Sequence, residues 1–238
     1  MSALRDRRLQ LAVVLGAAAA MAAVLVGASL IGAREDGSVP PPAAAPALEP
    51  EPSLFAGIEQ SGTALGSPAA PVTLVEYADL QCPYCAQWAR DALPTLVDDY
   101  VRAGKLRIVF HGLAFIGPDS NKALRTAVAA GRENHLWDVV HGLYLSQGAE
   151  NAGWVTDSLV REIVHGVPGL EPDTLLDGRW QKTIDPELER FAAAAKAAGV
   201  QGTPAFQVGP TGGRLERVEV ASLDPEGIVP AIEAALAR

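Results

Sequence analysis

The hydropathy pattern divides the chain into an apolar N-terminal segment, a Pro/Ala-rich stretch and a longer region of mixed elements. Residues 9–33 carry no ionisable side chain and consist mainly of Ala, Val and Leu. At about 1.5 Å per residue, a helix of this length crosses the roughly 30 Å hydrocarbon layer of a membrane. Arg5, Arg7 and Arg8 precede the segment, and basic residues favour the cytoplasmic side. We therefore predict a transmembrane helix at residues 9–33, with residues 1–8 in the cytoplasm.

A cleaved signal peptide is the alternative interpretation of the same segment. The small residues of Val26-Gly27-Ala28 are compatible with a cleavage site. The apolar stretch is longer than the roughly 7–15 residues of a signal-peptide core, which favours the anchor. Both interpretations export the rest of the chain. We expect a single-pass protein of the cell membrane with an extracytoplasmic domain, or a secreted domain if the segment is cleaved.

Residues 34–57 are expected to form a linker. Proline recurs along this stretch, with Pro40, Pro41 and Pro42 in succession, and no apolar periodicity is visible. Such a composition favours an extended, semi-rigid tether over a folded element. The globular domain is therefore expected at residues 58–238.

The domain is predicted to begin with a strand, a helix and a second strand. Residues 72–77 form a β-branched run that leads toward a pair of cysteines, and residues 106–110 form a second such run. Between the two runs, apolar side chains recur at helical spacing until about residue 104. Two strands joined by a helical crossover are parallel. This part of the sequence therefore predicts a β-α-β unit.

A helical insertion and a return to the sheet complete the predicted domain. The insertion covers about residues 112–198 and contains four helical stretches with no strand between them: 121–132, 136–145, 156–164 and 186–198. Short strands follow at 205–208 and 214–220. Asp224 then caps a last helix that starts at Pro225. The buried stripe of this helix is expected to be Ile228, Val229, Ile232 and Leu236. The fold class is therefore α/β.

The overall charge makes nucleic acid an unlikely partner class. The chain of 238 residues has 19 basic and 28 acidic residues, for a formal net charge of −9. Beyond the first eight residues, no run rich in Lys or Arg occurs. Nucleic-acid binding needs clustered positive charge, so we expect no nucleic-acid partner.

Cysteine usage indicates redox chemistry. The only two cysteines are Cys82 and Cys85, in the motif Cys82-Pro83-Tyr84-Cys85. A bridge between them closes almost no loop, so it does not staple a fold. A structural zinc site needs four ligands, and neither a second cysteine pair nor suitably spaced histidines are present. A purely structural disulfide is the remaining alternative to a redox pair.

The motif places Cys82 at the start of a helix. Unpaired N–H groups and the positive end of the helix dipole stabilise a thiolate at that position. Cys82 is therefore the predicted nucleophile, and Cys85 is the predicted resolving thiol that attacks a mixed disulfide. Pro83 fits the first helical turn because the missing N–H has no partner there. Tyr84 is expected to modulate the thiolate.

The order of elements around this motif resembles the thioredoxin fold in its DsbA-like form. The resemblance covers roughly residues 60–237 and depends on two anchors, residues 72–85 and 199–206. It implies a thioredoxin-like fold with an inserted helical subdomain. It also implies that Thr203 and Pro204 form a cis-proline loop that faces the cysteines and pairs with the substrate backbone. An ordinary trans proline that opens a strand is the alternative.

The resemblance also implies a role for Glu76, a charged residue within an apolar strand. It implies that Glu76 lies beneath the cysteines and assists proton transfer with the resolving thiol. The alternative is a glutamate at the strand end that faces solvent. We expect His111 to be a hydrogen-bonded core residue rather than a catalytic base. The four tryptophans are expected to be core or groove residues: Trp88, Trp137, Trp154 and Trp180.

These observations predict a thiol-disulfide oxidoreductase that introduces disulfide bonds into exported proteins. The expected substrates are protein thiols or disulfides, and no cofactor or metal is expected. The resemblance implies a membrane partner, a quinone-linked reoxidase. One alternative is a disulfide isomerase or reductase of the cell envelope. Another is a redox-dependent metal carrier or assembly-factor binding module, because two thiolates suit Cu(I); the scarcity of Met and the dispersed His count against it.

Overall fold

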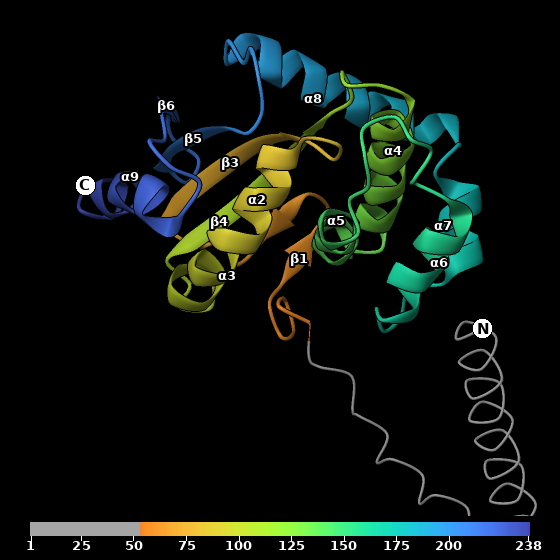
Figure 1. Ribbon diagram of the computed structural model, residues 1–238. Coiled ribbons are helices and arrows are strands. Elements are labelled where there is room, and N and C mark those ends of the chain that lie inside the picture. Colours follow the sequence, from red (N-terminus) through yellow and green to blue (C-terminus); the bar gives the residue numbers. More distant parts are fainter. Residues whose placement is uncertain (1–52) are drawn as a thin grey trace, which may run out of the picture. The chain divides into compact units, whose positions relative to one another are not determined.

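A six-stranded sheet forms the centre of the domain in the computed structural model, which describes residues 53–238 (Figure 1). The strand order is β1-β2-β4-β3-β5-β6. Strands β3 and β4 are parallel, as the sequence predicts, and all other neighbouring pairs are antiparallel. The strands are β1 (Gln60–Ser61), β2 (Ala64–Leu65), β3 (Val72–Asp79), β4 (Leu106–Leu113), β5 (Ala205–Pro210) and β6 (Glu216–Val218).

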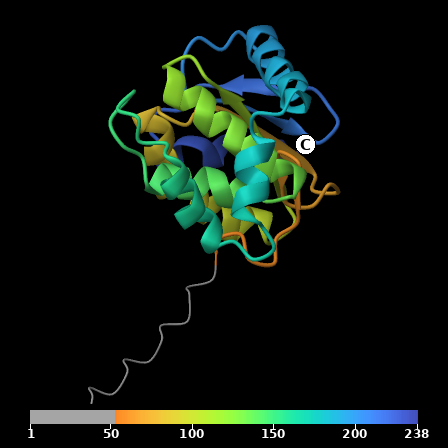
Figure 2. The same ribbon diagram turned by 90° about the vertical axis from the view of Figure 1, so that its right-hand side faces the viewer.

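Helices follow the parallel strands and fill the predicted insertion. Figure 2 shows the helices of the insertion in front of the strands. The helices are α2 (Pro83–Asp91), α3 (Leu93–Leu96), the π-helical turn η1 (Val97–Val101), α4 (Pro118–Arg132), α5 (Leu136–Leu145), α6 (Asp157–His165), α7 (Pro172–Gly178), the 3₁₀ turn η2 (Lys182–Ile184), α8 (Asp185–Ala197) and α9 (Pro225–Leu236).

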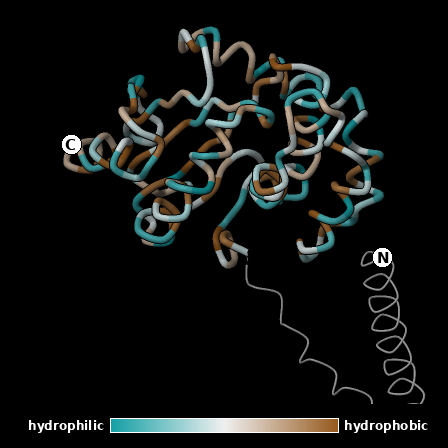
Figure 3. Tube along the Cα trace, viewed as in Figure 1, coloured by the Kyte–Doolittle hydropathy of each residue, from teal (hydrophilic) through white to brown (hydrophobic). Residues whose placement is uncertain are grey.

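The two faces of the sheet pack against different helices. On β4, alternate side chains such as Ile108 and Phe110 join the main hydrophobic core together with residues of α2 and α9. On the other face, Val75 and Tyr77 of β3 pack with Ala195 of α8 in a smaller cluster. Successive side chains of a strand point to opposite faces, so each central strand contributes to both clusters. Figure 3 shows hydrophobic and hydrophilic positions alternating along the helices that surround the strands.

The structure differs from the predicted elements in two ways: one predicted helix is interrupted, and two short strands and one short helix were not predicted. The single helix expected after the cysteines is divided into α2, α3 and η1. Pro94 lies in the first turn of α3 and has no N–H to donate to an earlier carbonyl, which interrupts the helix. Strands β1 and β2 were not predicted, because two residues each are too few to show an alternation. Helix α7 was also not predicted; only Leu175 and Leu176 of its seven residues are buried.

The C-terminal helix begins where the sequence predicts it. Asp224 has the extended backbone of an N-cap, and Pro225 lies in the first turn of α9. Among the described residues, however, the Asp224 side chain finds no backbone N–H to cap. Ile228 and Ile232 are fully buried, whereas the other two residues of the expected stripe are only partly buried. The buried face is therefore narrower than predicted.

A residue before the expected boundary at residue 58 packs in the core of the domain. Phe55 is 3% exposed and belongs to the main core. Its ring centroid lies 6.1 Å from that of Trp137 and 5.6 Å from that of His141. Phe55 therefore belongs to the domain rather than to the linker.

The predicted N-terminal helix at residues 9–33 and most of the predicted linker lie outside the described residues. Within residues 53–238, no helix combines the length and apolar character that a membrane crossing requires.

Candidate functional site

Cys82 lies between the end of β3 and the start of α2. Its backbone is extended and forms the N-cap of α2, with Pro83 in the first turn. The Cys82 carbonyl accepts the first helical hydrogen bond, from the N–H of Ala86 at 3.1 Å. The β3-α2 junction therefore holds Cys82 at the helix N-terminus that the sequence predicted.

Both cysteines are free thiols in the structure, and their surroundings differ. The pKa of the Cys82 thiol is lowered from 9.0 to about 6, first by a hydrogen bond from the Cys85 side chain. Further hydrogen bonds from the Thr203 side chain and from the backbone N–H groups of Tyr84 and Cys85 act in the same direction, against the opposing effect of burial. Near neutral pH, Cys82 is therefore largely a thiolate.

Cys85 lies one turn further along α2 and is completely buried. Burial is the main reason that its pKa lies well above 9.0, and the neighbouring charges of Cys82 and Glu76 raise it further. Cys85 therefore stays protonated where Cys82 is ionised. This asymmetry suits a nucleophile and a resolving thiol, the roles that the sequence predicted for the pair.

Glu76 lies in the middle of β3 and is 1% exposed. Its register partners are Phe110 of β4 and Phe206 of β5. Burial among such neighbours raises the pKa of the Glu76 carboxyl from 4.5 to about 8, with a smaller contribution from the charge of Cys82. Oε1 of Glu76 has no hydrogen-bond partner among the described residues. The structure thus contradicts the alternative of a solvent-facing glutamate.

The loop before β5 lies opposite Cys82. The Thr203–Pro204 peptide bond is cis, and Sγ of Cys82 lies 3.3 Å from the Thr203 carbonyl oxygen, to which the thiol donates a hydrogen bond when it is protonated. Both residues are partly exposed, and Tyr84 is 62% exposed. The accessible surface around Cys82 therefore includes the Thr203–Pro204 loop and the Tyr84 ring.

Several buried polar residues that fix the β3-α2 junction were not identified from the sequence. Both carboxylate oxygens of Asp79 accept hydrogen bonds, from the N–H groups of Gln81, Phe115 and Ile116 and from the hydroxyl of Ser120. The polar residues on both sides of Leu80, next to the cysteine motif, were the only signal in the sequence.

Gln147 is a second polar residue that fixes this junction, although it is only half-buried. Its amide donates to the Leu80 carbonyl at 2.9 Å and to the Cys82 carbonyl at 3.2 Å. Gln147 follows α5, in the helical insertion. The insertion therefore stabilises the backbone around the nucleophile. Gln147 and Cys82 are 65 residues apart in sequence, so no local pattern indicates this contact.

Two of the other expectations need correction. His111 is not hydrogen-bonded through Nδ1, which is buried without a partner among the described residues; instead the ring packs between Tyr77 and Phe191. Trp180 is 55% exposed and lies against the guanidinium groups of Arg125 and Arg179 rather than in the core. Trp88 is buried and contacts Phe206, as expected for a core residue.

Known proteins are similar to this chain in sequence and in fold. Residues 59–213 match the thioredoxin family. Over 147 residues, the chain is 30% identical to the probable disulfide bond formation protein D of Bacillus anthracis, a match that covers 60% of this chain and 68% of that protein.

Two solved structures are similar in fold. BdbD from Bacillus subtilis in its oxidised form has a TM-score of 0.65 at 24% identity, over 76% of this chain and 97% of that chain. The alpha-DsbA1 protein of Wolbachia pipientis has a TM-score of 0.61 at 19% identity, over 74% of this chain and 90% of that chain. Both likenesses concern the fold, including its helical insertion.

Proposed function

We propose that this chain, which belongs to the thioredoxin family and is a thiol-disulfide oxidoreductase, forms disulfide bonds in exported proteins. The observation that carries the proposal is the stabilised thiolate of Cys82, whose pKa is lowered to about 6 by hydrogen bonds. A stabilised thiolate favours the reduced form of the pair, and a stabilised reduced form makes the disulfide a stronger oxidant. The relatives named as disulfide bond formation proteins support the same direction.

The proposed steps of thiol oxidation follow from the different surroundings of Cys82 and Cys85. A substrate thiolate attacks Sγ of Cys82 in the oxidised pair, which breaks the Cys82–Cys85 bond and releases Cys85. Cys85 takes up a proton, because its pKa is raised. A second substrate thiolate then attacks the substrate sulfur of the mixed disulfide, and Cys82 leaves as a stabilised thiolate, which favours departure. The substrate loses two electrons and gains one disulfide, and the cysteine pair gains the two electrons.

Glu76 is the proposed source of the proton for Cys85. Its pKa of about 8 keeps the carboxyl protonated at neutral pH. By strand alternation, Glu76 faces the side of the sheet on which Leu74 and Ala78 pack with α2, and its ionised form raises the pKa of Cys85. A carboxyl held protonated in this position can give its proton to the departing Cys85 and recover it from water.

The redox equilibrium with glutathione tests the proposed direction, with the full-length chain kept in detergent. We expect a reduction potential closer to the roughly −120 mV of strong oxidants than to the roughly −270 mV of thioredoxin-type reductants. We also expect the oxidised chain to form disulfides in a reduced, unfolded protein faster than the reduced chain cleaves those of insulin. A potential near the thioredoxin value, together with fast insulin reduction, would favour the reductase alternative.

Replacement of one cysteine at a time identifies the role of each. Cys85→Ala should accumulate mixed disulfides between Cys82 and its substrates, because the resolving thiol is absent. Cys82→Ala is the matched control and should accumulate none, because Cys85 is completely buried and its raised pKa keeps it protonated. Stoichiometric copper binding by the unaltered chain, without thiol oxidation, would instead support the carrier alternative.

We further propose that residues 9–33 anchor the chain in the cell membrane and that the domain lies on the extracytoplasmic side. The apolar length of this segment and the basic residues before it support this arrangement. A membrane-impermeant thiol reagent should then label Cys82 in intact cells. The N-terminal sequence of the purified protein separates the two forms: an intact terminus indicates an anchor, and a terminus after Ala28 indicates cleavage.

A quinone-linked membrane protein is the proposed reoxidase, because the anchor would raise the local concentration of the domain at the bilayer. Quinone depletion should leave the Cys82/Cys85 pair reduced in cells. If the pair stays oxidised under those conditions, another oxidant restores it.

A further inference from the structure

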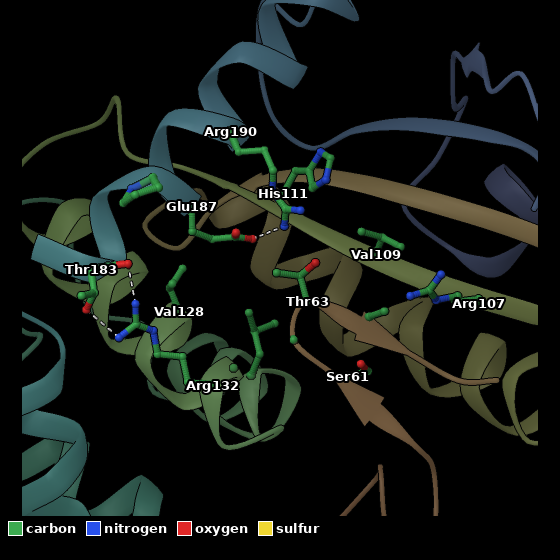
Figure 4. Close-up of a pocket in the computed structure, with 15 residues that line it drawn as sticks. Ser61, Thr63, Arg107, Val109, His111, Val128, Arg132, Thr183, Glu187 and Arg190 are labelled. Carbon is green, nitrogen blue, oxygen red and sulfur yellow. Dashed lines mark hydrogen bonds and ion pairs between the residues drawn. The ribbon is translucent and has the colours of Figure 1, made fainter. Parts of the chain in front are cut away.

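A pocket of about 740 Å³ opens between β4, the β1-β2 hairpin and the helices α4 and α8 (Figure 4). Its floor includes alternate residues of β4, Arg107, Val109 and His111. The volume lies in the range of about 300–1,000 Å³ that small-molecule sites occupy. None of the cysteine-site residues lines it.

The pocket is positively charged in a protein that is acidic overall. Arg107, Arg132 and Arg190 line it together with a single acidic residue, Glu187, which leaves an excess of two positive charges. The pKa of His111 is lowered to about 4 by burial and by Arg190, so that this residue is neutral. The whole chain has a formal net charge of −9. A positive concavity on such a protein focuses a local field that attracts anions.

Two of the three arginines are fixed by protein partners. Nη1 of Arg132 donates to the Thr183 hydroxyl at 2.7 Å, and Nη2 donates to the Thr183 carbonyl. Arg190 pairs with Glu187 one helical turn away. Figure 4 shows Arg132 and Arg190 on the helix side of the pocket and Arg107 on the strand side. These contacts hold the guanidinium groups of Arg132 and Arg190 at the rim. The pocket stays positive, because Glu187 offsets only one of the three arginine charges.

Arg107 differs from the other two arginines, because part of its guanidinium group is buried without a hydrogen-bond partner among the described residues. Its Nε is buried and has no hydrogen-bond partner among residues 53–238. Nδ1 of His111, on the same face of β4, is also buried without a partner in that part of the chain. Buried polar atoms normally find hydrogen-bond partners, and an exception needs an explanation such as a bound ion or water. The Arg107 Nε–H can only donate, and neutral His111 also donates in the tautomer that carries its proton on Nδ1. Together with the positive charge of the pocket, the unused Arg107 donor points to a ligand that accepts hydrogen bonds.

We propose that this pocket binds a small molecule bearing an oxyanion, a carboxylate or phosphate group, with Arg107 as the main ligand-binding residue. The planar guanidinium fork matches both groups and can donate two parallel hydrogen bonds. The hydroxyl of Thr63 lies at the pocket wall and adds a neutral donor, and the side chains of Val109 and Val128 offer an apolar surface for the rest of the molecule.

The pocket is separate from the redox site. Arg107 and His111 share the face of β4 with Val109, which packs against the α8 side of the sheet. The active-site helix α2 packs against the opposite face, with Ile108 and Phe110. Ligand binding is therefore an additional property of the domain, and substitution of Arg107 should leave the rate of thiol oxidation unchanged.

Titration calorimetry on the full-length chain in detergent tests the proposal. The probes are inorganic phosphate and succinate, with succinamide as the uncharged counterpart of succinate and sodium chloride to hold the ionic strength constant. We expect saturable binding of one anion per chain for at least one of the two probes and none for succinamide. Tighter binding of phosphate identifies a phosphate compound as the ligand class, and tighter binding of succinate identifies a carboxylate.

Three variants should change the affinity for the anion in different ways. Arg107→Gln should weaken anion binding by at least about tenfold, because it removes a charge-assisted hydrogen bond. Arg214→Gln changes the net charge equally in the exposed loop between β5 and β6 and should leave binding unchanged. Glu187→Gln should tighten binding, because it frees the Arg190 fork and removes the one acidic side chain that lines the pocket within residues 53–238.

An unchanged rate of thiol oxidation shows that each variant is folded. The proposal is overturned if neither probe binds at millimolar concentration, since the pocket then holds only water. It is also overturned if Arg107→Gln and Arg214→Gln bind equally well, or if Glu187→Gln weakens binding.

Discussion

The Sγ atom of Cys82 lies 3.3 Å from the carbonyl oxygen of Thr203, across 121 residues of sequence. This contact joins the N-terminus of α2 to the loop that precedes β5. The antiparallel pairing of β3 with β5 brings the two segments together. The reactive sulfur is therefore positioned by the sheet as well as by its own helix, and its pKa depends on both.

The first prediction concerns the pKa of Cys82 in the reduced protein. The hydrogen bond from the Cys85 side chain is the largest cause of its lowered value of about 6, and the Thr203 side chain contributes less. Cys85→Ala should therefore raise the pKa clearly, although not to 9.0, since the backbone N–H donors remain. Thr203→Val should raise it by a smaller amount. The pH dependence of alkylation by iodoacetamide gives each value.

Tyr84→Phe is the control for this series. Tyr84 acts on Cys82 through its backbone N–H, and its side chain is 62% exposed. The phenylalanine variant should keep the pKa near 6. If the pKa of Cys82 also stayed near 6 in Cys85→Ala, the helix N-terminus alone would account for the stabilised thiolate.

The second prediction concerns Glu76 and the pH dependence of stability. Its pKa is raised from 4.5 to about 8, so the folded protein binds this proton more tightly than the unfolded chain. The contribution of Glu76 to the free energy of unfolding is therefore largest below pH 4.5 and is lost progressively as the pH rises to about 8. Glu76→Gln should remove that loss and stabilise the reduced protein at pH 8 by at most about 4 kcal/mol.

Urea unfolding at pH 5 and pH 8 measures this difference. Glu162→Gln, at an exposed position of α6, is the matched control and should have little effect at either pH. If Glu76→Gln lacks the pH-dependent gain but slows the step at Cys85, the carboxyl is partly solvated in solution and still serves as a proton donor.

Local patterns predicted much of this fold and its redox pair, because β3, β4 and α2 each have a periodic or positional signal within their own sequence. Glu76 stood out for the same reason, as a charge in an apolar strand. The hydrogen bonds of Asp79 and Gln147 could not be predicted, since their partners come from segments that only the folded chain brings together. His111 shows the reverse error: its position suggested a hydrogen bond, but aromatic rings surround it.

The third prediction concerns the N-terminal limit of the domain. Phe55 lies in the stretch that composition assigned to the linker, yet its side chain is 3% exposed and contacts Trp137. Phe55→Ala should lower the free energy of unfolding by about 3–5 kcal/mol, because it leaves a cavity in the core. Leu145→Ala, at a position that is 59% exposed, should cost no more than about 0.5 kcal/mol. Equal small losses in urea unfolding would place Phe55 outside the cooperative unit.

The last prediction concerns the carboxylate that fixes the approach to Cys82. Asp79 is fully buried and accepts four hydrogen bonds, from three backbone N–H groups and the Ser120 hydroxyl. In Asp79→Asn, an NH₂ group replaces one acceptor and faces N–H or O–H donors. We expect the free energy of unfolding to fall by about 2–4 kcal/mol.

Two further variants set the scale for this loss. Ser120→Ala removes one donor from the network and should cost about 1 kcal/mol. Asp91→Asn changes an exposed carboxylate at the end of α2 and should be nearly neutral. Because Asp79 also orders the residue before Cys82 through the Gln81 N–H, Asp79→Asn should slow substrate oxidation while the protein is still folded. A loss of stability no larger than that of Asp91→Asn would show that the backbone of this junction holds its shape without the carboxylate.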